Sequence, residues 1–513
     1  MKSPARIAPA AATAASPAFA EVALAVKRAG KPAVKGSVKP EVEAAVGLPG
    51  PGPTMTLWLA VVLLVVLFAG GLFGYDQGVI SGALPGIKAT FSLSVLMVQV
   101  VTSWVTLGAL LGSLAAGELG DRLGRKKTVL VAGALFTLGA VVQYFAPDVA
   151  VLVAGRLIVG AGVGVAAVGA PLYAAEVAPA GVRGRFVSGY QLAITVGIFL
   201  AYLVNAQMSS SADWRLMLGA AAMPGLALFT TALLAPESPR WLMMKKRRAD
   251  AAAVTHRVQP GVAVEAQLDA IAAALHQQTK AVSWGGVFRR EWRRPLMIAL
   301  GLAVFQQVTG INAIIYYANQ IFASAGFSTE ASRMTVTTWA IGGVNVLATL
   351  IAIAFIDHVG RRRLLLVGLV GMGISLAVVG GAFRFIGPGV AGAAAARTSS
   401  AASTAGVVTV IALVVFIASF AFSLGPVTWT VINEVFPAPI RSRGVALATA
   451  ANWGSAWLVS QFFLSLVKAI GSSFTFWLLT LFCVLGWIWI FYRVPETKGQ
   501  TLEQIQQMWK TAP

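Results

Sequence analysis

Charged residues and cysteine are both scarce in this chain. Charged side chains make up 11% of its 513 residues and hydrophobic side chains 57%, and the mean hydropathy is +0.78. Soluble domains carry about 25% charged residues, so the composition excludes an ordinary soluble domain and indicates a membrane protein. The apolar runs are continuous rather than alternating, which excludes a transmembrane barrel. Cys483 is the single cysteine, so no disulfide can form within one chain.

Acidic residues are few as well: 19 Asp and Glu oppose 39 Lys and Arg, and the formal net charge is +20. A basic chain can bind nucleic acid, but these basic residues are not interleaved with aromatic ones as in nucleic-acid binders. They cluster between alternate apolar runs, which is the pattern of the positive-inside rule. We therefore expect contact with membrane lipid and no nucleic-acid partner.

Recognisable catalytic groups are absent from the sequence. It contains no nucleophile–base set, phosphate-binding loop or cluster of metal ligands, and its three histidines all fall between apolar runs. We expect neither an enzyme nor a bound cofactor or metal.

Twelve apolar runs are each long enough for a transmembrane helix. They lie at about 57–75, 94–117, 128–146, 149–172, 187–208, 215–235, 295–318, 334–356, 364–386, 406–432, 445–468 and 473–492. The sequence predicts an all-α membrane protein of twelve transmembrane helices in two six-helix halves, 54–235 and 295–493. A cytoplasmic linker with short helices, 236–294, joins them, and a disordered tail, 1–53, and a cytoplasmic segment, 494–513, flank them.

The distribution of basic residues predicts the orientation. Loops assigned to the cytoplasm hold 32 of the 39 Lys and Arg, and the opposite loops hold six. This asymmetry places both termini in the cytoplasm. We expect a multi-pass protein of the plasma membrane. The Ala-rich, acid-poor tail leaves an organellar transit peptide as the alternative.

The two halves repeat one another in sequence. Three motifs recur in order: 121–127 (DRLGRKK) as 357–363 (DHVGRRR), 176–185 (beginning EVAP) as 434–443 (beginning EVFP), and 236–238 (PES) as 495–497 (PET). Repeats of this kind are typical of transporters built from duplicated helix bundles.

One uncharged run, Gly301 to Gln320, is unusually polar. It carries three amides and two tyrosines: Gln306, Gln307, Asn312, Tyr316 and Tyr317. Amides in hydrocarbon are costly unless they find partners, and their donors and acceptors suit vicinal hydroxyls. Hydrogen bonding between packed helices is the alternative. The number of amides favours a binding site that faces a water-filled cavity.

Two charges lie within or at the end of early apolar runs: Asp76 follows the first run, and Arg156 lies inside the fourth. A charge at mid-membrane costs about 2.5 to 3.5 kcal/mol on insertion scales, so such charges pair or face water. An acid and a base in one half suggest a pair whose strength depends on protonation of Asp76. A purely structural pair or a charge at a helix end is the alternative.

The chain resembles the sugar porter family of the major facilitator superfamily. The resemblance is carried, in the order of the family, by GELGDRLGRKK, GRLIVGAGVG, PESPRWL, QQVTGINAIIYYA, DHVGRRRLL, GPVTWTVINEVFPAPIRSRG and VPETKG. These motifs extend over about residues 57 to 505. The resemblance implies the major facilitator fold, transport of a sugar by alternating access, and a working monomer.

The resemblance also implies roles for individual residues. Asp76 and Arg156 match the proton-coupling pair of family members driven by protons. The residues that match sugar contacts are Phe73, Gln191, Gln306, Gln307, Asn312, Tyr316, Asn345, Trp429 and Asn452.

The repeated loops carry acids as well as bases, and acids contribute little to topology. We expect a cytoplasmic gate of ion pairs that part when the carrier faces inward. The expected pairs are Asp121 with Arg125, Glu176 with Arg185, Asp357 with Arg361, and Glu434 with Arg443. The alternative is that these loops only set topology. The basic run 245–248 either contacts anionic lipid or is solvated.

We therefore predict a proton-coupled symporter of a monosaccharide or related polyol, with the sugar site mainly in the second half. A passive uniporter is the alternative. A sugar sensor is a third hypothesis, which the short segment after the last run disfavours. The sequence does not distinguish hexose, pentose and polyol.

Overall fold

The computed structural model describes residues 55–209, 213–277, 285–386, 400–437 and 440–498. These residues are helical apart from short connections. The predicted tail, 1–53, and the chain beyond 498 lie outside the described residues, so the predictions made for them stay untested.

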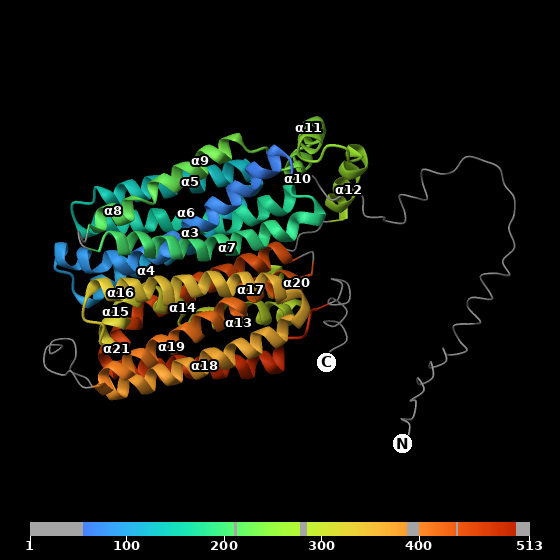
Figure 1. Cartoon of the computed structure of the whole chain (residues 1–513). Helices are drawn as coiled ribbons and strands as arrows, with labels where there is room; N and C mark the ends of the chain where they lie inside the picture. The colour runs from blue at the N-terminus through green and yellow to red at the C-terminus, as the bar shows by residue number, and fades with distance from the viewer. Residues whose placement is uncertain (1–54, 210–212, 278–284, 387–399, 438–439, 499–513) are drawn as a thin grey trace, which may run out of the picture. The chain divides into compact units, whose positions relative to one another are not determined.

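The helices fall into three sets along the chain (Figure 1). The N-terminal helices are α3 (Leu57–Phe91), α4 (Val95–Leu123), α5 (Arg125–Tyr144), α6 (Val149–Val177), α7 (Ala180–Gln207), α8 (Trp214–Gly219) and α9 (Ala222–Leu234). The linker contains α10 (Pro239–Met244), α11 (Arg248–Val258), α12 (Val264–Gln277) and the 3-10 turns η1 (Gly285–Phe288) and η2 (Arg290–Trp292). The C-terminal helices are α13 (Arg293–Val308), α14 (Ile311–Tyr316), α15 (Ala318–Ser324), α16 (Glu330–Val336), the π-helix η3 (Thr337–Gly343), α17 (Val344–Val359), α18 (Arg361–Ile386), α19 (Ser400–Phe422), α20 (Leu424–Val435) and α21 (Arg441–Arg493).

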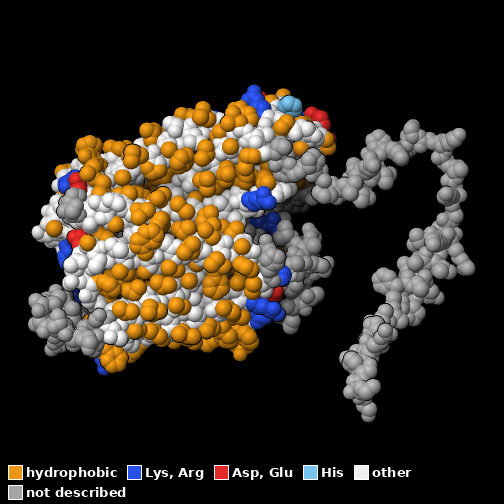
Figure 2. All heavy atoms as spheres, in the orientation of Figure 1, with side chains coloured by type: hydrophobic (Ala, Val, Ile, Leu, Met, Phe, Trp, Pro, Cys, Tyr) orange, Lys and Arg blue, Asp and Glu red, His pale blue; other side chains and the backbone are white. Residues whose placement is uncertain are grey.

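Eleven helical segments within the described ranges are long and apolar enough to cross a bilayer. The last, α21, has 53 residues and contains Gly471 at φ 82° and ψ 159°, which is not helical. A continuous helix of that length would extend about 80 Å, far beyond a bilayer. The helical course breaks at Gly471, so α21 divides into two parts that correspond to the two last predicted spans, and the described residues then hold twelve segments of membrane-spanning length. Hydrophobic side chains cover the middle of the face in Figure 2, and charged ones lie toward its ends.

The first helix is longer than its apolar run predicts. α3 continues from Leu57 to Phe91, and its residues from Gly74 to Leu84 are buried. The predicted end at Tyr75 is therefore wrong, because protein rather than lipid surrounds the second part of the helix and continuous hydrophobicity is not needed there. Asp76 lies in the middle of α3, so it is not a charge at a helix end.

Three of the predicted spans form interrupted helices. The predicted span 295–318 breaks after α13, where Gly310 adopts a left-handed conformation at φ 93°. The predicted span 334–356 contains the π-helix η3. The predicted span 406–432 breaks at Ser423, between α19 and α20. Interrupted helices free backbone groups and redirect side chains, and inside a membrane they occur where protein or a cavity surrounds them.

Small residues fix the packing of α4 on α6. Gly108 and Gly112 of α4 lie against Gly160 and Gly164 of α6, and a methyl group added at any of them would overlap the opposite backbone. Each pair has the four-residue spacing that lets two helices approach closely in a membrane. This contact places Arg156, one turn before Gly160, deep among the N-terminal helices.

Hydrogen bonds between α4 and α21 join the N-terminal and C-terminal helices. Ser103 donates to Gln461 over 2.6 Å, and Ser465 donates to Gln99 over 3.0 Å. Gln99 and Ser103 are fully buried. We call these four residues the polar clasp. It lies toward the end of the bundle that carries the α3–α4 turn at Ser92.

Removing the polar clasp should shift the conformational equilibrium. Each buried hydrogen bond contributes about 1 kcal/mol, so the double substitution Ser103→Ala with Ser465→Ala, which removes both donors, should change the ratio of conformers by about thirtyfold. Electron–electron distance measurements between spin labels at the exposed residues Leu96 and Ile470, with Cys483 replaced by alanine, report the opening of this end. We expect a new population at longer distance. An unchanged distribution would contradict a role for the clasp. Ser375→Ala, which removes a hydroxyl bonded within its own helix, is the control.

Candidate functional site

Five amides form one chain of hydrogen bonds in the middle of the molecule. They come from α3, α13, α14 and α21 and are all at most 7% exposed. Gln77 donates to Asn312 over 3.1 Å, Asn312 to Gln307 over 2.9 Å, Gln307 to Asn452 over 3.2 Å, and Asn452 to Gln306 over 2.7 Å. We call these residues the amide chain.

The break at Gly310 makes the amide chain possible. In a continuous helix, residues five apart point about 140° away from one another around the axis. Gln307 and Asn312 are five apart, yet their side chains meet because the chain turns at Gly310. Glycine tolerates the left-handed conformation that this turn requires. Gly310 therefore provides the turn that brings the Gln307 and Asn312 side chains together.

Backbone carbonyls fix the direction of the amide chain. Gln306 donates through Nε2 to the carbonyl of Leu424 over 2.7 Å, and Asn452 donates through Nδ2 to that of Ala303 over 3.0 Å. Carbonyl oxygens accept only, so the nitrogen and oxygen of both amides are determined. Each remaining amide then donates toward this anchored end. The amide chain presents a defined order of donors and acceptors.

Aromatic rings and Asp76 border the amide chain. The rings of Phe73 and Trp453 lie 5.3 Å apart, centroid to centroid. Together with Asp76, Gln77, Tyr316 and side chains of α4 and α6 they line a narrow space between α3, α4, α6, α14 and α21, which has too little room for a water molecule. An apolar ring can cover the C–H face of a sugar while amides bind its hydroxyls.

Asp76 and Arg156 form a buried ion pair on the other side of this space. Nη1 of Arg156 donates to Oδ1 of Asp76 over 2.6 Å, and Nε donates to the carbonyl of Val101 over 3.2 Å. The Arg156 side chain is fully buried and that of Asp76 is 7% exposed. Nη2 of Arg156 is buried without a hydrogen-bond partner. Protonation of Asp76 would remove the charge that Arg156 binds and leave the guanidinium uncompensated, which is costly in a buried site.

The structure places the predicted contact residues in two groups. Gln306, Gln307, Asn312 and Asn452 belong to the amide chain, and Phe73 and Tyr316 border it. Gln191, Asn345 and Trp429 are hydrogen-bonded to none of these amides in the part of the chain that the structure describes. The amide nitrogen of Gln191 approaches Gly425 from the opposite half. Asn345 is buried just after η3, and Trp429 is half-buried on α20.

Gln77 and Trp453 are absent from the predicted contacts. Gln77 follows Asp76 directly, and Trp453 follows Asn452. Ending the first span at Tyr75 placed Gln77 in a loop. The absence of charge from Gln77 to Ile87 is the signal that could have extended the helix and placed an amide at mid-membrane.

Comparison with known proteins identifies the family. A family model described as "Sugar (and other) transporter" matches residues 62–509. The chain is 40% identical over 441 residues to the putative metabolite transport protein YwtG of Bacillus subtilis, covering 85% of this chain and 92% of that protein. It is 34% identical over 448 residues to the arabinose-proton symporter of Bacillus subtilis, covering 86% and 92%. The chain belongs to the sugar porter family of the major facilitator superfamily.

A solved structure confirms the predicted fold of this sugar porter. The partially occluded, inward-open xylose transporter XylE of E. coli matches with a TM-score of 0.73 and 29% identity, over 86% of this chain and 99% of that one. The sugar porter is accordingly a multi-pass membrane transporter with the major facilitator fold, and it is not an enzyme.

A polar network ties the N-terminal helices of the sugar porter together at the end where α4 and α5 meet, which we call the basic end. Arg125 contacts both carboxylate oxygens of Glu176 over 3.0 and 3.1 Å and Asp121 over 2.9 Å. Glu237 accepts from the backbone N–H groups of Arg125 and Lys126 over 2.9 and 3.1 Å. This carboxylate therefore caps the N-terminus of α5, where it satisfies free N–H groups and opposes the positive helix end.

The second half repeats the arrangement with side chains that are more exposed. Glu496 accepts from the backbone N–H groups of Arg361 and Arg362 over 2.9 and 3.2 Å and so caps α18. Arg361 lies 3.5 Å from Glu434. Gly124 and Gly360 both have φ 101°, and a methyl group at either would overlap the capping carboxylate. The three repeated motifs therefore form one local structure in each half.

The predicted ion pairs of these loops need correction. Asp121 does contact Arg125, but Glu176 binds Arg125 instead of Arg185, which is exposed. Glu434 approaches Arg361, the second-half equivalent of Arg125, rather than following the predicted pairing along its own loop. The side chain of Asp357 lies outside what the structure describes. Pairing by nearness in sequence failed because helix ends from different motifs converge. The acids of PES and PET, Glu237 and Glu496, were missed for the same reason.

Neutralising the capping carboxylate of Glu237 should slow sugar uptake more than neutralising that of Glu496. Glu237→Gln removes a cap from a buried network, whereas Glu496→Gln removes a cap from a more exposed one, where water can replace the lost bond. A charge-assisted bond contributes about 1.5 to 3 kcal/mol, so we expect the first change to slow uptake at least tenfold and the second to slow it less. Initial rates of labelled-sugar uptake at matched protein levels measure this. Equal effects would contradict the difference between the halves. Glu330→Gln, at the half-buried start of α16 away from both networks, is the control.

Basic residues of the linker are partly neutralised by nearby acids. Arg247 pairs with Asp250 over 2.7 Å, and Arg248 with Glu265 and Asp269. The hydrogen bond to Glu265, followed by that to Asp269, raises the pKa of Arg248. These pairs are solvent-exposed and contribute little to stability. These ion pairs favour the alternative that the basic run 245–248 is solvated rather than bound to anionic lipid.

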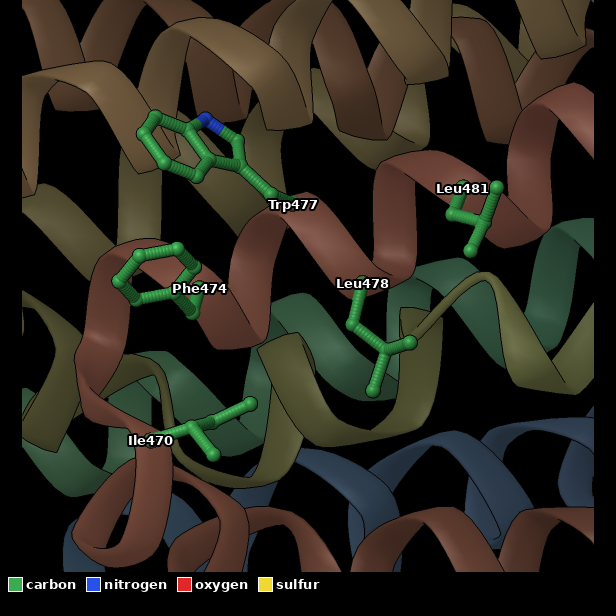
Figure 3. Close-up of a pocket in the computed structure, with 5 residues that line it drawn as sticks. All are labelled: Ile470, Phe474, Trp477, Leu478 and Leu481. Atoms are coloured by element: carbon green, nitrogen blue, oxygen red, sulfur yellow. The ribbon is translucent and has the colours of Figure 1, made fainter.

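A separate hollow on α21 is apolar. Ile470, Phe474, Trp477, Leu478 and Leu481 line it, and all project from the helix around the break at Gly471 (Figure 3). The Trp477 ring nitrogen donates to the carbonyl of Ala377 rather than into the hollow. The side chains that line the hollow present carbon atoms and no free hydrogen-bonding groups. The hollow is therefore not suited to bind the hydroxyls of a sugar.

Proposed function

We propose that this sugar porter is a proton-coupled symporter of a monosaccharide or related polyol that works by alternating access. The observation that carries the proposal is the position of the Asp76–Arg156 ion pair. It borders the same space as Phe73, Tyr316 and the amide chain. A proton site and a hydroxyl-binding site that share one wall can influence each other directly. The names of the arabinose-proton symporter and of the xylose transporter support this substrate class.

The amide chain is the proposed sugar site. Its amides bond to one another in the structure, so binding exchanges amide–amide bonds for amide–hydroxyl bonds without leaving donors unpaired. Phe73 and Trp453 supply the apolar cover. Gln191, Asn345 and Trp429 complete the proposed contacts from α7, α17 and α20. Specificity among pentoses, hexoses and polyols would follow from which hydroxyls pair with the fixed order of donors and acceptors.

Asp76 is the proposed proton carrier. With Asp76 ionised, Arg156 binds it and holds α3 against α6. Protonation removes one charge of the pair, so α3 is free to move relative to α6. The proton and the sugar then cross together, because both act on the same stretch of α3. Release of the proton to the other side restores the ion pair.

The networks at the basic end are the proposed cytoplasmic gate. Asp121, Arg125, Glu176 and Glu237 hold the N-terminal helix ends together, and Arg361, Glu434 and Glu496 hold the C-terminal ones. The excess of basic residues supports a cytoplasmic position for this end. We propose the plasma membrane as the site of action and a monomer as the working unit.

Uptake into proteoliposomes tests the proposal. The purified chain is reconstituted and offered labelled glucose, galactose, xylose, arabinose and myo-inositol, with and without an inward proton gradient. We expect at least one of them to accumulate above its external concentration only when the gradient is present. Equilibration to the same level under both conditions would identify a passive uniporter instead, and binding without uptake of any compound would identify a sensor.

A further inference from the structure

Gln77 contacts the proposed sugar site from the N-terminal helices. It lies on α3, is 7% exposed, and donates to Asn312 of α14 over 3.1 Å. Tyr316 lies beside it. Gln77 therefore uses its amide donor within the space that Phe73, Asp76 and Trp453 also line.

The other members of the amide chain belong to the C-terminal helices. Gln306, Gln307, Asn312 and Asn452 come from α13, α14 and α21. The bond from Gln77 to Asn312 is thus the step at which the amide chain crosses between the two sets of helices. Any movement of α3 relative to α14 must lengthen or break it.

Gln77 also occupies the free end of a directional chain. The far end is anchored on the carbonyls of Leu424 and Ala303, and each amide donates toward it. The Asn312 nitrogen donates to the oriented Gln307, so the Asn312 oxygen faces Gln77 and accepts from it. Without the Gln77 donor, the Asn312 oxygen loses a buried partner, and the Asn312 side chain is held by a hydrogen bond at one end only.

Gln77 is joined covalently to the proposed proton site, because Asp76 is the preceding residue of the same helix. Movement of α3 on protonation of Asp76 carries Gln77 with it and changes the position of Asn312. We infer that Gln77 is a positioning residue that holds Asn312 for the sugar and transmits the protonation state of Asp76 to sugar affinity. This inference rests on the proposed function.

The test replaces Gln77 by methionine, which keeps the length of the side chain and removes its donor and acceptor. Equilibrium exchange of the labelled sugar that wild type accepts gives the KM at several pH values without a net gradient. We expect the KM to rise about tenfold, and its dependence on pH to be lost, while the maximal exchange rate changes little. Gln143→Met, at another buried glutamine away from the amide chain, is the matched control and should retain the wild-type profile.

Each outcome of the KM measurements on Gln77→Met supports or overturns the inference. A raised KM with the wild-type pH dependence would overturn the inference, because Gln77 would then be a sugar contact alone. An unchanged KM would overturn it as well. If Gln77→Met does not fold, Gln77→Asn, which keeps an amide too short to reach Asn312, is measured in the same way. Wild-type exchange that does not depend on pH, with no proton flux, would reject the proposed symport itself and is seen before any variant is made.

Discussion

Replacing Asp76 by asparagine should abolish proton-driven accumulation and leave equilibrium exchange of sugar intact. In symport of one proton per sugar, an inward gradient of about one pH unit can concentrate the sugar about tenfold. Asparagine has nearly the shape of a protonated aspartate but cannot release a proton. The variant should therefore equilibrate the sugar and never exceed the external concentration. The measurement is the accumulated ratio of labelled sugar under an imposed gradient, beside counterflow exchange without one.

Arg156 gives this prediction its physical basis. Its side chain is fully buried and binds Asp76 over 2.6 Å. Loss of the carboxylate leaves a buried cation with a weaker partner, so the melting temperature should be measured alongside. Asp148→Asn is the matched control, because asparagine caps a helix as well as aspartate does and Asp148 caps α6 outside the site. Accumulation by Asp76→Asn against a gradient would contradict the role assigned to Asp76.

Replacing Gln307 by leucine should nearly eliminate sugar binding. Gln307 lies in the middle of the amide chain, where it donates to Asn452 and Gln306 and accepts from Asn312. Leucine has a similar volume but no polar atoms, so two buried neighbours lose partners and the sugar loses an amide. A site that binds hydroxyls through hydrogen bonds loses affinity by large factors when a buried polar group is left unpaired. We expect the KM for exchange to rise about a hundredfold.

A matched glutamine separates binding from folding in this experiment. Gln143→Leu removes a buried amide from α5, where it bonds only a backbone carbonyl over 3.4 Å. Both variants should show comparable melting temperatures, and only Gln307→Leu should lose binding. A KM within twofold of wild type for Gln307→Leu would show that the amide chain is structural packing and not the sugar site.

The sequence predicted the fold because the relevant signals are local. Runs of about 20 apolar residues define the spans, and the repeated DRLGRKK and PES motifs define the duplication. The amides of α13 and α14 could be recognised because Gln306, Gln307 and Asn312 stand in an otherwise apolar run. The break of the helix at Gly310, between Gln307 and Asn312, is a finding of the structure.

Features that depend on the meeting of distant segments could not be predicted. The uncharged stretch after Asp76 could have extended α3, but the sequence does not show that Gln77 meets Asn312 of the other half. Glu176 reaches Arg125 because the ends of α5 and α6 converge, and no spacing in the sequence reveals that. The polar clasp joins residues more than 350 positions apart.

Sugar-evoked proton movement is the most direct test of the central claim that sugar and proton cross together. Proteoliposomes containing the wild-type chain and a trapped pH-sensitive dye, without any imposed gradient, receive the sugar that the uptake panel selects. The account predicts acidification of the interior on addition of sugar, none with a sugar that is not transported, and none with Asp76→Asn. Sugar entry with no change of internal pH in wild type would contradict symport and leave a passive carrier.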